Sequence, residues 1–310
     1  MPLFQLVTRR FLLAIPTVIG VCTVVFFLSH LIPGDPVDYI LQDQTNPIDR
    51  LQLQKELGLD KPIVAQYIHY FNNLLHGDLG KSYYSHGRTV LNLILERLPY
   101  TLILAISSMM CALLFSIPLG IFAALKAFSW KDTSVMFIAL LGISIPNFAL
   151  GPALIVIFVL LIGLDIPVSG FVAGSSLILP TLTLGTSLMA LLTRMTRTSF
   201  MEVLKQDYVR TAYAKGLQER SILFKHCLRN ALNPVATIAG LQFGTLLTGS
   251  IITEKIFDWP GLGSLFISSI QSRDFLVVQG CILVIAIIYI FINLLTDIGY
   301  SILDPRISIR

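Results

Sequence analysis

The chain has 310 residues, of which 55% are hydrophobic and 13% charged, with a mean hydropathy of +0.77. Because soluble globular proteins have about a quarter of their residues charged, this composition excludes a soluble enzyme and a soluble nucleic-acid-binding protein. The net charge of +4 comes from basic residues grouped beside apolar runs, a pattern typical of membrane topology rather than of nucleic-acid binding. The four cysteines have no Cys-x-x-Cys spacing, so the sequence predicts neither a disulfide framework nor a metal centre.

Six stretches of the chain lack Asp, Glu, Lys and Arg, and each has at least 22 residues. They cover residues 11–34, 98–125, 133–164, 166–193, 230–253 and 275–296. A helix needs about 20 apolar residues to cross a bilayer, and it satisfies its own backbone hydrogen bonds there. The sequence therefore predicts an all-α polytopic membrane protein with six transmembrane helices. The expected helices are 10–31, 99–125, 134–162, 177–195, 232–253 and 276–302.

The N-terminal third contains one helix and a small predicted cap. The first run is read as a retained helix, because no small-x-small cleavage site precedes Pro33. Residues 35–97 carry eight acidic side chains and helix-like patches at 49–58 and 63–75, separated by Gly58 as a C-cap and Pro62 as a new start. We therefore divide the chain into residues 1–93, with the first helix and an extracytoplasmic cap, and residues 94–303, with the other five helices.

The orientation follows from the basic residues. With both termini in the cytoplasm, the inner segments carry 14 Lys and Arg residues and the outer segments eight. Six of those eight lie in the long segment 32–97, which the positive-inside rule weighs little. Only Lys255 and Arg273 remain in short outer loops, so both termini are predicted to be cytoplasmic.

The sequence offers no convincing catalytic motif. Gly80-Lys81-Ser82 resembles the end of a phosphate-binding loop, but that loop needs a glycine at the position of Leu75. The five histidines show no metal-ligand spacing. No nucleophile elbow or intramembrane acidic pair is present. We therefore expect no catalytic residue, no metal site and no nucleotide hydrolysis by this chain itself.

The 36-residue segment from Arg194 to Arg229 is the longest predicted inner loop. Four positions within it share one helical stripe: Met201, Leu204, Tyr208 and Ala212. This spacing predicts an amphipathic helix that ends at Gly216. Exposed small residues near the turn, Ala212 and Ala214, suit insertion into a groove on a partner. A helix lying on lipid headgroups would also explain the basic residues, and the pattern alone leaves both interpretations open.

Two runs in this region resemble the EAA loop of ABC importer permeases, in the dipeptide and oligopeptide branch. Residues 207–217 read DYVRTAYAKGL, and residues 226–234 read HCLRNALNP. Further motifs of that branch follow in the same order along nearly the whole chain: Pro33-Gly34-Asp35-Pro36, Leu57-Gly58-Leu59-Asp60-Lys61-Pro62, Gly77-Asp78-Leu79-Gly80, Arg97-Leu98-Pro99 with Thr101, Gly142-Ile143-Ser144-Ile145-Pro146 with Phe148, Glu254 with Phe257, Pro260-Gly261-Leu262-Gly263, and Asp304-Pro305-Arg306. The sequence departs from the usual pattern at Tyr213, where the family has a basic or polar residue.

The resemblance implies the type I ABC importer permease fold and a set of partners. They are a second, similar permease in a heterodimer, two ATPase subunits that use ATP and Mg²⁺, and an extracytoplasmic solute-binding protein. It also implies that a coupling helix, placed at Arg210–Ser221 within the loop 196–231, contacts the ATPase. The residues expected to carry this contact are Asp207, Arg210, Ala212, Tyr213, Ala214, Lys215, Gly216 and Leu217. No cofactor is expected to bind this chain. The chain is expected to contact the lipid bilayer and not to bind nucleic acid.

Apart from Arg10 and Arg194 at their ends, the predicted spans contain no Asp, Glu, Lys or Arg before Asp297, although an ion-coupled carrier needs such groups at mid-membrane. Energy is therefore expected to arrive from a partner. The candidate residues lining a passage are polar: Ser144, Asn147, Gln242, Thr245 and Asn293. Small residues at 237, 240, 244 and 248 form a stripe in the fifth span, which indicates close helix packing or, alternatively, lining of the passage.

The outer loop after the fifth span combines aromatic residues with glycines. Its candidate residues for docking of a binding protein or for gating are Glu254, Phe257, Trp259, Pro260, Gly261 and Gly263. We expect Phe257 and Trp259 to be exposed beside the mouth of a passage, where aromatic side chains commonly form contacts. A simple turn is the alternative.

Together these observations predict a bacterial inner-membrane permease subunit of an ATP-driven importer for dipeptides, oligopeptides or a related small solute such as glutathione or a nickel chelate. The passage would open alternately to the two sides of the membrane. An ion-coupled carrier and a membrane scaffold that anchors a cytoplasmic protein remain as alternatives.

Overall fold

The computed structural model describes residues 3–31, 51, 54–55, 60–82, 84–85, 87–172 and 174–303. Those ranges are almost entirely helical, and the only strand-like pairing among them is an isolated antiparallel bridge between Lys81 and Thr89. The all-α prediction is therefore confirmed. Most of the predicted helix at 49–58, and the motif residues 33–36, 57–59 and 304–306, lie outside the described residues.

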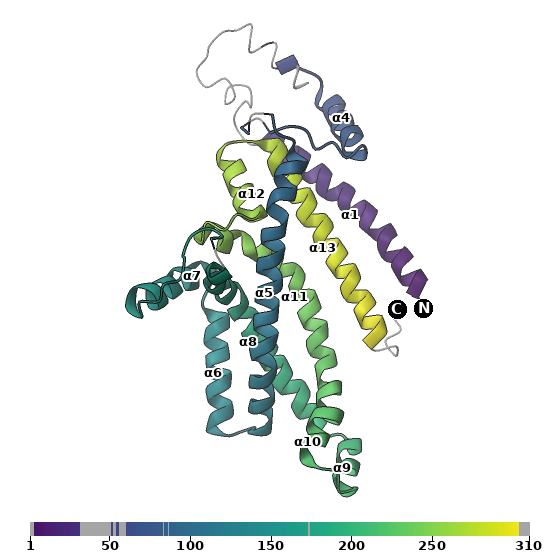
Figure 1. Cartoon of the computed structure of the whole chain (residues 1–310). Helices are drawn as coiled ribbons and strands as arrows, with labels where there is room; N and C mark the ends of the chain where they lie inside the picture. Colours follow the sequence, from purple (N-terminus) through teal and green to yellow (C-terminus); the bar gives the residue numbers. More distant parts are fainter. Residues whose placement is uncertain are drawn as a thin grey trace.

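Five helices are long and apolar enough to cross a membrane, and a bent pair of helices adds a sixth span if it is counted as one. The five are α1 (Leu3–Leu31), α5 (Val90–Leu125), α8 (Ile178–Leu204), α11 (Leu228–Ile256) and α13 (Phe275–Leu303). Helix α8 packs along α5 and α11, and α1 lies beside α13 at the edge of the bundle (Figure 1).

The single helix predicted at 134–162 is wrong. The chain instead forms α6 (Trp130–Ser144), α7 (Asn147–Ile155) and a π-helical turn η1 (Val156–Leu161), and the axis bends by 105° between α6 and α7. Pro146 has no N–H to continue α6, and it disfavours helical geometry at the residue before it. Ile145 accordingly adopts φ −89° and ψ 117°. Figure 1 shows α7 pointing sideways from the bundle.

Two helices extend beyond their predicted ends. Helix α5 begins at Val90 rather than at 99, because the Thr89 side chain accepts a hydrogen bond from the Asn92 N–H and caps the first turn. The proposed boundary between residues 93 and 94 therefore falls inside a helix. Helix α8 continues to Leu204 rather than ending at 195, so the first part of the predicted loop 196–231 is helical.

Two short helices lie at one end of the bundle, the α4 end. Helix α4 (Ile63–Leu75) packs its aromatic side chains on α1. The Tyr67 and Tyr70 rings lie 5.3 and 5.5 Å from the Phe26 ring, and the Tyr67 hydroxyl is 2.7 Å from that of Thr23. Helix α12 (Leu262–Gln271) packs between α11, α13 and α5.

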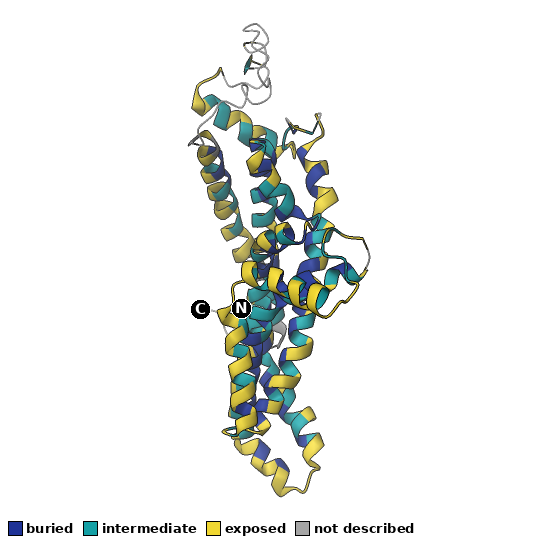
Figure 2. Ribbon diagram, turned by 90° about the vertical axis from the view of Figure 1, so that its left-hand side faces the viewer, coloured by how far each residue is buried: buried dark blue, intermediate teal, exposed yellow. Residues whose placement is uncertain are grey.

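Buried side chains form three clusters along the bundle. The central cluster joins α5, α8, α11 and α13. The second joins the end of α8 to α9 (Asp207–Ala214) and the start of α11, and the third joins α12 to the ends of α5 and α13 nearest α4. Figure 2 shows these buried residues running through the interior, while the outward faces of the long helices are exposed. An exposed apolar surface of this kind is expected for helices in contact with lipid.

Candidate functional site

A short helical hairpin projects from the end of the molecule opposite α4 (Figure 1). It consists of α9 (Asp207–Ala214), α10 (Glu219–Ser221) and the π-helical turn η3 (Ile222–Cys227), which leads directly into α11. We call residues 207–227 the α9 hairpin. The predicted coupling helix at Arg210–Ser221 is wrong as a single element, because the chain turns between α9 and α10.

The turn depends on Gly216, which has φ +74°. The Gly216 N–H donates to the Tyr213 carbonyl at 2.9 Å, and the Leu217 N–H donates to the Ala212 carbonyl at 3.3 Å. These two bonds form a Schellman C-cap, in which the residue after the helix adopts a left-handed conformation that favours glycine. The helix thus ends where the sequence places a break.

Only one face of α9 is buried. Val209 and Ala212 are 1% and 7% exposed, packed with Phe200 of α8 and Ile222 of η3. The prediction that Ala212 is exposed is therefore wrong. The predicted stripe from Met201 to Ala212 is wrong as well. It assumed one continuous helix, but α8 ends at Leu204 and a separate helix, α9, begins at Asp207.

The opposite face of the α9 hairpin is free. Its exposed residues include seven of the eight predicted for the ATPase contact: Asp207, Arg210, Tyr213, Ala214, Lys215, Gly216 and Leu217. Arg210 lies 3.8 Å from Asp207, and both side chains are well exposed, so this pair contributes little to stability. The hairpin therefore has a small buried base and a polar outer surface.

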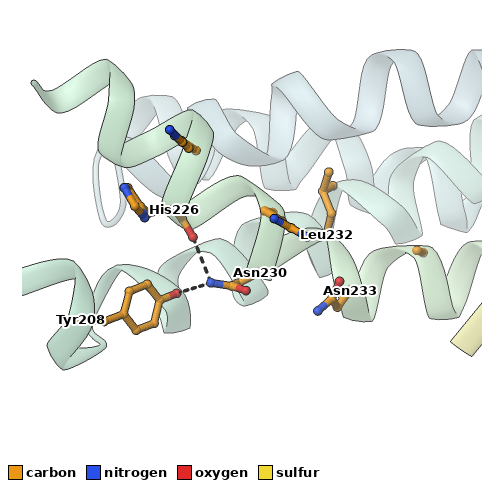
Figure 3. A pocket seen from close by; sticks show the side chains of 8 residues that line it. Tyr208, His226, Asn230, Leu232 and Asn233 are labelled. Atoms are coloured by element: carbon orange, nitrogen blue, oxygen red, sulfur yellow. Dashed lines mark hydrogen bonds between the residues drawn. The ribbon is translucent and has the colours of Figure 1, made fainter. Parts of the chain in front are cut away.

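A cavity of about 870 Å³ opens between the α9 hairpin and the start of α11 (Figure 3). Its lining residues are Tyr208, Lys225, His226, Arg229, Asn230, Leu232, Asn233 and Ala236. The Asn230 side-chain amide donates to the Tyr208 hydroxyl at 2.9 Å and to the His226 carbonyl at 3.0 Å. We call this the basic cavity. Sequence reasoning missed it, because its walls come from three elements, α9, η3 and α11.

The predicted passage residues do not form one site. Gln242 and Thr245 lie together on α11, where the Thr245 hydroxyl is 2.6 Å from the Gln242 side-chain oxygen. Ser144 and Asn147 flank the bend between α6 and α7. Asn293 lies on the same stripe of α13 as Tyr289 and Thr296, the side chains that lie against Gly244 and Gly240 of α11.

The small residues predicted as one stripe of α11 do not all have the same surroundings. A Cβ atom at Gly240 would lie 2.4 Å from Thr296, and one at Gly244 would lie 2.6 Å from Tyr289. These two glycines therefore allow α13 to pack closely, which favours the packing interpretation there. Thr245 and Thr248 are exposed and leave a polar strip on the free face of α11.

The loop after α11 forms a buried polar connection, which we call the Glu254 clamp. Oε1 of Glu254 accepts from the hydroxyls of Thr101 at 2.7 Å and Ser250 at 3.2 Å. Oε2 accepts from the backbone N–H groups of Gly263 at 2.7 Å and Ser264 at 3.1 Å. Four donors compensate the cost of burying this carboxylate, and they join α5, α11 and α12.

Gly261 and Gly263 have to be glycines because Glu254 and the backbone before it lie directly against them. A Cβ atom at Gly261 would lie 2.4 Å from the Glu254 carboxyl carbon, and one at Gly263 would lie 2.5 Å from the backbone of Ile251. The prediction that Phe257 and Trp259 are exposed is wrong, since they are 1% and 0% exposed. The Trp259 indole N–H donates to the Tyr100 carbonyl at 3.0 Å. The argument for docking through exposed aromatic residues therefore fails, and Pro260 is half-buried as well.

An ion pair that sequence reasoning missed holds α6 against α8. Arg197 donates from Nε and Nη2 to the two carboxylate oxygens of Asp132, each at 2.6 Å. The same carboxylate accepts from the Phe128 N–H at 2.9 Å. The two side chains are 5% and 20% exposed, so this two-point contact is well shielded from solvent.

Comparison with known families and proteins agrees with this architecture. The binding-protein-dependent transport system inner membrane component family matches residues 116–309, and the N-terminal part of that component matches residues 3–105. The chain is 43% identical over 304 residues to the glutathione transport system permease protein GsiC of Escherichia coli K12, covering 98% of this chain and 99% of that protein. The GsiC protein of Shigella flexneri serotype 5b matches to the same extent.

Solved transporters share the fold at low sequence identity. The inward-facing MetNI methionine ABC transporter aligns with a TM-score of 0.58 at 18% identity, over 68% of this chain and 96% of that chain. An amino acid ABC transporter solved with histidines aligns with a TM-score of 0.52 at 16% identity, over 68% and 94%. With two family models and a full-length relative in agreement, the chain belongs to the family of inner-membrane components of binding-protein-dependent transport systems, and it is a multi-pass permease subunit of an ABC importer.

Proposed function

We propose that this permease imports glutathione or other short peptides across the bacterial inner membrane by alternating access. The observation that carries the proposal is the 43% identity to a glutathione permease over 98% of the chain. Glutathione is itself a tripeptide, so it falls within the peptide cargo that the sequence motifs indicate. The polar strip formed by Gln242, Thr245 and Thr248 on α11 supports a passage along this helix, because polar groups are costly against lipid.

A second, similar permease would cover that polar strip and form a heterodimer with this chain. Two features support such a neighbour. Helix α7 and η1 point away from the bundle with exposed apolar side chains, including Phe148, Leu160 and Leu161, and the free face of α11 remains uncovered. The passage would then lie between the two permeases, and an extracytoplasmic binding protein would deliver the solute.

The α9 hairpin would couple this chain to one of two cytoplasmic ATPase subunits, which bind and hydrolyse ATP with Mg²⁺. Its small buried base and free polar face suit a helix that inserts into a groove on a partner. The distribution of basic residues supports placing the hairpin and both termini in the cytoplasm. Closure of the ATPase pair would displace α9 and, through η3, the start of α11.

The test is solute uptake by the assembled transporter in proteoliposomes. We expect labelled glutathione or a dipeptide to enter only when ATP, the ATPases and the binding protein are present, and an ionophore to have no effect. Uptake that persists without the ATPases and collapses with the ionophore would establish an ion-coupled carrier instead. Assembly without any ATP-dependent solute entry would favour the scaffold.

A further inference from the structure

The basic cavity has a concentrated positive charge that no acidic group balances. Three of its eight lining residues are basic, Lys225, His226 and Arg229, and none is acidic. None of these three forms an ion pair within the part of the chain that the structure describes. The carboxylates of Asp207 and Glu219 in the same hairpin are exposed and do not line the cavity.

Neutral hydrogen-bond donors complete the polar part of the cavity. Asn230 is held by its two bonds to Tyr208 and His226. Because the Tyr208 oxygen accepts one of those bonds, its own O–H proton remains available to a ligand. Figure 3 shows Tyr208 joined to Asn230 by a hydrogen bond, with Asn233 further along α11. The Tyr208 hydroxyl and the Asn233 side-chain amide are the neutral donors left for a ligand, and together with the basic groups they match the chemistry of a phosphate.

The cavity also has an apolar part, and this part points to a lipid. Leu232 and Ala236 line its wall and belong to the charge-free run 230–253, whereas Lys225 and Arg229 precede that run. The cavity therefore crosses the boundary between the polar and the hydrocarbon segments. A free phosphate needs only the polar part, but a phospholipid presents a charged group and an apolar body across the same boundary. Basic pockets beside transmembrane helices are known to suit such headgroups.

We infer that the basic cavity binds the phosphate group of an anionic phospholipid from the cytoplasmic leaflet, and that the bound lipid links the α9 hairpin to α11. The inference rests on the proposed function for its cytoplasmic placement. The lipid would contact Tyr208 of α9 together with Lys225 and Arg229, so it would stiffen the connection through which α9 moves α11. Coupling between ATP hydrolysis and uptake should then depend on anionic lipid.

The experiment compares lipid binding by assembled transporters. Three complexes are placed in nanodiscs of phosphatidylcholine. They are the unaltered complex, the complex carrying Lys225→Gln with Arg229→Gln, and a control complex carrying Lys126→Gln with Lys131→Gln. Phosphatidylglycerol is then titrated, and bound lipid is counted by native mass spectrometry. Since a Lys or Arg that contacts the headgroup contributes about fivefold to binding of an anionic lipid, loss of the two cavity cations should weaken binding at the cavity by about thirtyfold. The control pair consists of Lys126 at the end of α5 and Lys131 in the first turn of α6, both exposed and outside the cavity, so its loss should leave binding at the cavity unchanged.

Four further results decide the outcome. Lys225→Arg with Arg229→Lys should retain lipid binding, which separates charge from misfolding. Excess inorganic phosphate should displace little lipid, and full displacement would overturn the inference in favour of a soluble phosphate. A different result would overturn the lipid inference in favour of a protein contact. In that case all complexes would bind lipid equally, and only the complex with Lys225→Gln and Arg229→Gln would lose the ATPase or the partner permease. ATP-driven uptake that is undiminished in pure phosphatidylcholine would refute the lipid requirement while leaving the proposed function intact.

Discussion

The Glu254 clamp and the α9 hairpin differ in how they are held. In the clamp, one buried carboxylate receives four hydrogen bonds from three helical regions, and Phe257 and Trp259 are enclosed beside it. In the hairpin, one face of an eight-residue helix is buried and the rest is exposed. A region held by many buried polar bonds opens rarely, whereas one with few buried contacts opens at low free energy.

The difference suggests where movement is concentrated. A displacement applied at α9 can reach the bundle only through its apolar base and through η3, because the rest of the hairpin makes few contacts. At the other end of α11 the clamp resists rotation. We therefore expect changes at the clamp to alter stability and changes at the hairpin to alter coupling.

The largest effect is expected for Glu254→Gln. The amide keeps one acceptor oxygen but points an NH₂ group at two donors, and leaving buried donors unpaired costs about 3 kcal/mol in total. Denaturant unfolding of the purified subunit in detergent should show this loss. Lys255→Gln, at the exposed neighbouring position, is the control. Equal stability of the two variants would mean that the clamp is not a rigid element.

A smaller loss of stability is expected for Asp132→Asn. The substitution removes the charge that pairs with Arg197, and the expected cost is about 2 kcal/mol, at the low end for shielded pairs because Arg197 retains some exposure. Asp165→Asn, at an exposed loop position, provides the control in the same unfolding measurement. If Asp132→Asn lowered stability more than Glu254→Gln, the strongest polar contact would lie at the α9 end of the bundle and not at the Glu254 clamp.

Local signals in the sequence predicted local features of the structure. Charge-free runs located the spans, and Gly216 marked a turn, because its effect acts on its own backbone. The helix ends at Val90 and Leu204 were missed. Hydropathy marks where a helix leaves the bilayer, and helices can continue beyond that point.

Contacts between distant residues were not predictable in the same way. Glu254 and Thr101 are 153 positions apart, and Asp132 and Arg197 are 65 apart. Glycines and aromatics in the 254–263 loop were read as signs of exposure, but they pack around a buried carboxylate whose partners only the fold brings close. The basic cavity depends likewise on how η3 turns into α11.

Gly216→Ala tests the hairpin with a modest effect on stability. A side chain at φ +74° is strained, although nothing lies within 4 Å of its Cβ, so the expected cost is about 1 kcal/mol. Gly163→Ala is a matched control, with φ +78° and equally open space in the loop that follows η1. We expect both to lose the same stability, while only Gly216→Ala lowers uptake per ATP hydrolysed. Equal coupling in the two variants would argue against the hairpin as the coupling element.

The smallest change in stability is expected for Thr245→Val, which nevertheless distinguishes passage from packing. The substitution keeps the shape of an exposed side chain and removes a hydroxyl that bonds to Gln242, so stability should change by less than about 0.5 kcal/mol. Thr17→Val is the control, since Thr17 is an exposed residue of α1 whose hydroxyl bonds within its own helix. If the free face of α11 lines the passage, only Thr245→Val should alter the concentration of solute at half-maximal uptake. Unchanged transport in both variants would instead assign this strip to contact with the second permease, and the polar residues of α11 would then hold the two permeases together.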